Sequence, residues 1–173
     1  MRGKWGLLLL VWVAIFTTGC GFSLNRQRQL LPNGASLIAF GEVENKTFFP
    51  GLDLRLRQGI EKKLATQKLI HIVPIRVAEQ ILSLRIISNK MEKEEFSKEE
   101  EGLVQYVFTV KGAFALFETK SQSYLFKDHR VSATYTVKMY QIPEPDHFEI
   151  QQGYFKALQS LSNQIYESLT NEF

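Results

Sequence analysis

The chain has 173 residues, 45% of them hydrophobic, with 21 Lys and Arg against 18 Asp and Glu. That length is enough for one domain with a core of its own, and a net charge of +3 gives no ground for a general affinity for nucleic acid. The single cysteine, Cys20, excludes a disulfide within the chain.

The first twenty residues have the arrangement of a bacterial export signal. Two basic residues precede an apolar run from Trp5 to Phe16, and small residues lead from there to Cys20. At about twelve residues, the run is shorter than the roughly twenty that a membrane-spanning helix needs. A plain transmembrane anchor is therefore disfavoured, and residues 1–19 are predicted to be a lipoprotein signal peptide.

The position of Cys20 identifies the type of signal. A cysteine directly after the cut becomes the first mature residue and carries acyl chains, so we predict a covalent N-terminal lipid on Cys20 and no other cofactor. An ordinary signal with an incidental cysteine is the alternative, because Thr17 stands where the lipoprotein pattern usually has an aliphatic residue. Gly21 is not the aspartate that retains lipoproteins in the inner membrane, so the predicted location is the periplasmic side of the outer membrane.

The first half of the mature chain predicts strands and one helix. An apolar strand is expected over 36–43 and an alternating strand over 80–88, with an amphipathic helix over 52–67 between them. Residues 69–73 could form a further short strand, which Pro74 would limit to an edge or an end. The helix has an apolar residue at every fourth position: Leu52, Leu56, Ile60 and Leu64.

The second half predicts two long strands and a final helix. Residues 89–102 are polar and are expected to form a long loop or an extended hairpin tip. Apolar and polar residues then alternate over 106–118 and 124–140, as in antiparallel strands with one buried and one solvent-exposed face. A helix beginning near Gly153 follows, with an apolar stripe that ends at Leu169.

These elements predict an α+β fold. Two helices with one apolar stripe each and a sheet with one apolar face can bury one another in a two-layer sandwich. The expected order is β-α-β-β-β-α, with both helices on one face of a mixed, mostly antiparallel four-stranded sheet. Residues 20–35 are predicted to be the lipidated N-terminus and a tether, and residues 36–173 a single domain.

Catalytic motifs are not recognisable in this sequence. His71, His129 and His147 are scattered, without the spacing of metal ligands, and no nucleophile elbow, phosphate loop or zinc-protease motif occurs. The acidic residues within 92–101 are read as a solvated segment rather than a metal site. We therefore expect a protein that is not an enzyme and holds no metal.

Several segments together resemble one family. They are C-G-F-S-L from Cys20 to Leu24, V-E-N-K-T-F-F-P-G-L-D from Val43 to Asp53, and Ala78-Glu79 before I-L-S-L-R-I. With two long tyrosine-containing strands and a C-terminal helix, the chain resembles the lipopolysaccharide-assembly lipoproteins, the E component of the lipopolysaccharide transport pathway. Glu79 is a departure, because the family usually has aspartate there.

The resemblance implies a function and partners. It implies a non-catalytic outer-membrane lipoprotein that plugs and helps assemble the β-barrel lipopolysaccharide translocon, and that guides lipopolysaccharide to the outer leaflet. The implied partners are that barrel and lipopolysaccharide, with no nucleic acid. Phe48 and Phe49 could form an apolar tip that contacts the barrel, or could equally cap the core.

Lipopolysaccharide carries phosphates and acidic sugars, which pair with Arg and Lys. Basic residues on the wet faces and ends of the predicted strands are therefore candidate contacts, although each could be an ordinary surface charge. They are Arg85, Lys90, Lys111, Lys127, Arg130 and Lys138.

Two other classes of function remain open at this stage. One is a periplasmic binding or regulatory lipoprotein that acts on a cell-wall synthase or a transporter. The other is a hydrolase whose active site is assembled from distant residues.

Overall fold

A computed structural model describes residues 31–95, 103–140 and 144–171. The predicted signal peptide, Cys20 and most of the predicted tether lie outside the described residues. The elements in chain order are η1 (Pro32–Gly34), β1 (Leu37–Asn45), α2 (Leu52–Ala65), β2 (His71–Ile72), η2 (Ile75–Val77), β3 (Gln80–Glu95), β4 (Leu103–Glu118), β5 (Ser123–Tyr140) and α3 (His147–Asn171).

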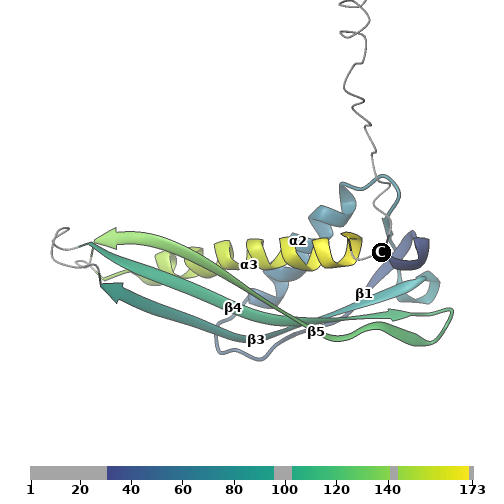
Figure 1. Ribbon diagram of the computed structural model, residues 1–173, viewed down its shortest axis with the longest axis horizontal. Helices are drawn as coiled ribbons and strands as arrows, with labels where there is room; N and C mark the ends of the chain where they lie inside the picture. Colours follow the sequence, from purple (N-terminus) through teal and green to yellow (C-terminus); the bar gives the residue numbers. More distant parts are fainter. Residues whose placement is uncertain (1–30, 96–102, 141–143, 172–173) are drawn as a thin grey trace, which may run out of the picture.

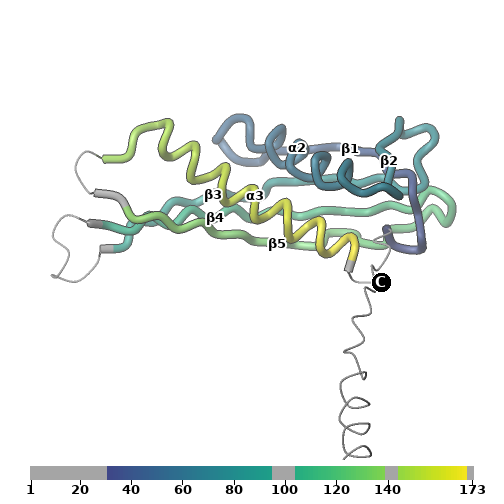
Figure 2. The backbone as a smooth tube through the Cα atoms, turned by 90° about the horizontal axis from the view of Figure 1, so that it is seen from above, coloured from purple at the N-terminus to yellow at the C-terminus, as the bar shows by residue number. Residues whose placement is uncertain are grey.

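The strands form one sheet with both helices on the same side of it (Figure 1). Seen from above, α2 and α3 lie side by side along the sheet (Figure 2). The predicted α+β class with two helices is confirmed, but the predicted number of four strands is wrong. The sheet has five strands in the order β2-β1-β3-β4-β5, because the short segment at residues 71–72 joins its edge.

The sheet is mixed. Strand β1 pairs in parallel with both β2 and β3, as the strand–helix–strand order of the sequence favours. Strands β3, β4 and β5 form an antiparallel meander whose members are 16 to 18 residues long. The long hairpins give the sheet the extended shape visible in Figure 1.

Strand β3 extends further than its hydrophobic pattern predicts. Residues 89–95, expected to belong to a polar loop or hairpin tip, pair with β4 as far as Glu95 opposite Val104. Four consecutive residues in this part of the strand are exposed: Met91, Glu92, Lys93 and Glu94. The sequence therefore lacks the alternation of apolar and polar residues from which a strand is predicted. The rest of that segment, residues 96–102, lies outside the described residues.

Helix α3 begins at His147, before the predicted start at Gly153. The Glu149 backbone N–H donates to Asp146 Oδ1 over 2.8 Å, and the Asp146 N–H donates to Glu149 Oε2 over 3.0 Å. This reciprocal capping satisfies backbone donors that a helix start leaves free. The first turn is therefore stabilised by capping and not by an apolar stripe. For that reason the hydrophobic periodicity did not predict it.

The core lies between the helices and the inner face of the sheet. The predicted stripe of α2 is fully buried, with α2 packed on β1, β2 and β3, whereas α3 covers β4 and β5. Leu31 and Pro32, at the end of the predicted tether, are also buried, and the buried Gln80 side chain donates a hydrogen bond to the Pro32 carbonyl oxygen over 2.8 Å. The start of the described chain is thus held against the domain.

Close approach of α3 to the sheet depends on Gly153. A Cβ atom at this position would lie 2.5 Å from the ring of Phe108, a fully buried residue of β4. The same ring packs edge-on against Tyr154, with 5.3 Å between centroids. Any side chain at Gly153 would therefore push the helix away from the aromatic centre of the core.

We predict that Gly153→Ala lowers the free energy of unfolding, by about 1–3 kcal/mol as for other overpacked cores. This is the reverse of the usual gain when alanine replaces glycine inside a helix. Chemical denaturation measures the change. The double variant Gly153→Ala, Phe108→Leu should lose less stability than the two single changes together, because the smaller side chain leaves room for the new methyl group. Additive losses would contradict the proposed clash.

Glu79 joins the start of β1 to the start of β3. Its Oε2 atom accepts hydrogen bonds from the backbone N–H groups of Ser36, over 2.7 Å, and Leu37, over 3.1 Å. Its own N–H donates to the Leu37 carbonyl oxygen over 2.9 Å. The bonds from Ser36 and then Leu37 hold the pKa of Glu79 below its ordinary value of 4.5, because they stabilise the carboxylate.

This arrangement predicts a pH dependence. Because the folded pKa is the lower one, the unfolded chain takes up the proton first as the pH falls. The contribution of Glu79 to stability is complete above its unfolded pKa and is lost as the pH falls through its folded pKa. Glu79→Gln should thus lower the unfolding free energy at neutral pH and flatten its fall between about pH 6 and pH 3. Denaturation across this range, with the exposed Glu42→Gln as control, tests it; equal pH slopes in all three proteins would rule it out.

Candidate functional site

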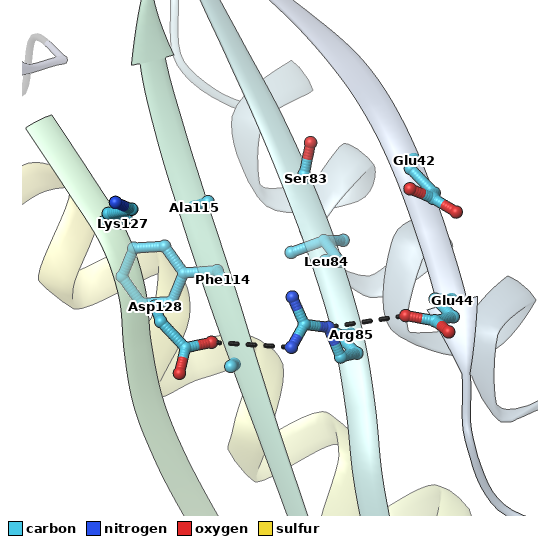
Figure 3. A pocket seen from close by; sticks show the side chains of 10 residues that line it. Glu42, Glu44, Ser83, Leu84, Arg85, Phe114, Ala115, Lys127 and Asp128 are labelled. Carbon is cyan, nitrogen blue, oxygen red and sulfur yellow. Dashed lines mark ion pairs between the residues drawn. The ribbon is translucent and has the colours of Figure 1, made fainter. Parts of the chain in front are cut away.

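The outer face is the side of the sheet that is turned away from the helices. It carries a cluster of charged side chains. A shallow depression of about 60 Å³ lies in it, across β1, β3, β4 and β5 (Figure 3). Small side chains form its floor, and charged ones stand around it. Its polar and small lining includes Glu42, Glu44, Ser83, Arg85, Ala115, Lys127 and Asp128.

Arg85 is the centre of this cluster. Its Nε atom lies 3.4 Å from Glu44 Oε2 on β1, and its Nη1 atom lies 3.7 Å from Asp128 Oδ1 on β5 (Figure 3). Asp128 Oδ2 is in turn 3.4 Å from Arg130 Nε, and Glu44 Oε1 is 3.6 Å from Lys46 Nζ. Acidic and basic groups therefore alternate across the sheet. Each such half-exposed pair contributes under about 1 kcal/mol to the free energy of unfolding. These ion pairs therefore affect the charge of the surface more than the stability of the fold.

The strand register brings these residues together. Glu44 is the partner of Arg85 in the parallel pairing of β1 with β3, and Ala113 lies opposite Arg85 on β4. Ala113 is also in register with Arg130 on β5. Its short side chain leaves space above β4, so that Arg85 can reach the carboxylate on β5. Sequence reasoning did not identify Glu44 or Asp128, because only the long-range register places them beside Arg85.

The six basic candidates all stand on the strands β3, β4 and β5, but they do not form one group. Arg85, Lys127 and Arg130 gather at the depression and its rim. Lys90 lies five residues further along β3, a distance of about 17 Å, and is paired with Glu92 at 2.6 Å. Lys138 is further still along β5, opposite Gln105.

Lys111 and Lys127 differ from the other candidates in their charge environment. Lys111 is exposed on β4 beside Ser132 of β5, and Lys127 is exposed at the depression. Neither has an ion pair or a hydrogen bond of its side chain with the part of the chain that the structure describes. The positive charge most open to an external anion on this face is therefore theirs.

The two phenylalanines predicted as an apolar tip have separate environments. Phe48 is completely exposed, whereas the Phe49 ring packs against Tyr154 at 4.9 Å between centroids and stacks on His147 at 5.8 Å. Asn45 holds this turn, because its Nδ2 donates to the Phe49 carbonyl oxygen over 2.8 Å. Phe49 thus caps the core, and Phe48 alone projects from the turn.

Among residues 31–95, 103–140 and 144–171, His, Cys, Asp and Glu do not gather in groups that could hold a metal ion. Within the same ranges, no helix has both the length and the apolar character needed to cross a bilayer.

Known proteins resemble this chain in fold but not in sequence. No protein-family model matches the chain, and no curated protein matches it. A minor lipoprotein from Acinetobacter baumannii superposes with a TM-score of 0.50 at 10% identity, over 78% of this chain and 91% of that one. The hypothetical protein CT253 from Chlamydia trachomatis superposes with a TM-score of 0.51 at 6% identity, over 78% of this chain and 98% of that one. At these identities the likeness establishes a shared fold alone.

Proposed function

We propose that this protein is a non-catalytic lipoprotein, anchored through Cys20 to the periplasmic side of the outer membrane, that plugs and helps assemble the β-barrel lipopolysaccharide translocon. The observation that carries the proposal is a long sheet whose hydrated outer face carries alternating acidic and basic side chains, preceded in sequence by a lipoprotein-type signal. The Acinetobacter protein with this fold is itself a lipoprotein, which supports the anchor.

A protein that fits inside a barrel needs a polar surface, because the lumen wall of such barrels is polar. The outer face meets that requirement with alternating charges rather than one sign of charge. Such a surface can exchange hydrogen bonds and ion pairs with a polar wall at little cost in unpaired charge. Phe48, the exposed residue of the turn after β1, supplies one apolar contact at the rim of the domain.

Guidance of lipopolysaccharide is the second part of the proposal. Its phosphates would be met on the outer face by Lys111 and Lys127, whose charges have no acidic partner among the described residues. Arg85 and Arg130 are already paired with Asp128, so an incoming phosphate would first have to displace a carboxylate. The paired arginines are therefore secondary contacts in this proposal.

Capture of the partner tests the proposal most directly. We expect tagged protein, extracted from outer membranes in mild detergent, to bring down one large β-barrel protein in equal amounts. The mass of the captured chain should show a lipid on Cys20. Phe48→Ser should weaken the complex, while Val77→Ser, which removes another exposed apolar side chain just before β3, should leave it intact. Recovery with a cell-wall enzyme or transporter instead would favour the regulatory lipoprotein.

Charge reversal tests the lipopolysaccharide contact. The double variant Lys111→Glu, Lys127→Glu should weaken binding of purified lipopolysaccharide about tenfold or more, because two charge-assisted contacts become repulsions. The control Lys68→Glu, Arg76→Glu makes the same change of net charge at exposed positions away from the outer face. Circular dichroism establishes that each variant is folded. An equal loss in both double variants would reduce the effect to overall charge and remove the two lysines from the proposal.

A further inference from the structure

A second surface feature lies on the opposite side of the domain, between the two helices. It is a groove of about 680 Å³, a size typical of sites for small ligands. Helices α2 and α3 run side by side here (Figure 2), and their outward faces form its walls. This helix groove is lined mainly by Arg55, Gln58, Lys62 and Lys63 from α2 and by Phe155, Lys156 and Gln159 from α3.

The charged side chains that line the helix groove are all basic. Arg55, Lys62, Lys63 and Lys156 line it, and no carboxylate is among its lining residues. Lys62 and Lys156 have no ion pair or hydrogen bond of their side chains anywhere in the described ranges. Glu61, the acid next to Lys62 in sequence, is held by Arg57 at 2.8 Å instead.

Aromatic rings, rather than acids, hold the other two cations. The Arg55 guanidinium lies over the Phe155 ring, 4.4 Å from its centroid, and Lys63 Nζ lies 5.7 Å from the centroid of Tyr166. Cation–π contact positions a charge without neutralising it. The groove therefore differs from the outer face, where Arg85 and Arg130 are paired with carboxylates, and it concentrates uncompensated positive potential that attracts anions.

The spacing of these charges indicates a ligand larger than a single ion. Arg55 and Lys62 are two helical turns apart on the same face of α2, which places their Cα atoms about 10 Å apart. Lys156 contributes a cation from the opposite wall. A phosphate diester with polar groups around it can reach several of these side chains, and the amides of Gln58 and Gln159 offer further hydrogen bonds.

On α3, an exposed aromatic residue lies one turn before Gln152, the first residue of this helix that lines the groove. Phe148 stands seven residues before Phe155, and so on the same face of α3, and its side chain is 63% exposed. The half-buried Phe155 ring continues this apolar face inside the groove, whereas Leu158 belongs to the core. A cationic groove with an exposed aromatic residue one turn beyond it matches an amphiphile, with the anionic part among the cations and the apolar part next to Phe148.

We propose that the helix groove binds the phosphate headgroup of an anionic phospholipid. Lys62 and Lys156 contact the phosphate from opposite walls, Arg55 is held in place for it by Phe155, and Phe148 lies against the beginning of the acyl chains. The inference concerns the helix side of the domain and does not depend on the barrel partner or on the outer face.

The test uses the full lipidated protein in neutral detergent micelles containing equal amounts of phosphatidylglycerol and phosphatidylcholine. Native mass spectrometry counts the molecules of each lipid that stay bound. We expect selective retention of phosphatidylglycerol, and about a tenfold loss in Lys62→Glu, Lys156→Glu, because two attractive contacts become repulsive. The matched control, Arg76→Glu, Lys120→Glu, changes the net charge equally at exposed positions outside the groove and should retain the lipid.

Three results would overturn the proposal: equal retention of both lipids, an unchanged count in the groove variant, or an equal loss in the control variant. The source of the phosphate is tested with glycerophosphoglycerol, the same headgroup without acyl chains. It should compete weakly, and Phe148→Ser should reduce retention of phosphatidylglycerol. Full competition by the free headgroup, with no effect of Phe148→Ser, would instead identify a water-soluble phosphate ligand. None of these results bears on lipopolysaccharide binding at Lys111 and Lys127.

Discussion

The structure depends on burying the single apolar face of its sheet under two helices. That burial requires α3 to lie almost in contact with the strands, which the absence of a side chain at Gly153 permits above the ring of Phe108. The fully buried stripe of α2 completes the cover. Because both helices lie on one side, the other side of the sheet stays in contact with water (Figure 1). The outer face and the helix groove are thus two consequences of the same one-sided packing.

The two surfaces differ in how their charge is balanced. On the outer face, the carboxylates of Glu44 and Asp128 alternate with basic side chains, and each is paired with two of them. In the helix groove, Lys62 and Lys156 stand on different walls, without acids in the lining. A balanced surface suits a broad contact with a polar protein wall, whereas an unbalanced groove suits an anion. The two proposals therefore assign a protein partner to one side of the domain and an anionic lipid to the other.

Local patterns predicted much of this fold, and long-range pairing accounts for what they missed. The alternation in β4 and β5 and the four-residue spacing in α2 identified the inward side chains, because burial on one face imposes those periods. Pro74 indicated a possible edge strand over 69–73, and β2 lies there, but its pairing with β1 is a long-range contact that a local pattern does not give. The charged end of β3 is strand because β4 pairs with it. In the candidate site, the sequence identified the basic residues but not their acidic partners. Asp128 reaches Arg85 only across the short side chain of Ala113, a contact that depends on the strand register.

The topology also sets an order of assembly. Strands β3, β4 and β5 follow one another along the chain and can zip into a meander through contacts between near neighbours. Strand β1 must instead find β3 across a long stretch of chain, and the hydrogen bond from Ser36 to Glu79 closes a loop of 43 residues. Contacts of that separation carry the larger loop-closure cost and so form late. Strand β1, with β2 as the neighbour that pairs only with it, is therefore expected to join after the meander has formed. Until β1 joins, one edge of β3 is unpaired. The Glu79 carboxylate helps to cover this edge, because it accepts hydrogen bonds from the backbone at the start of β1.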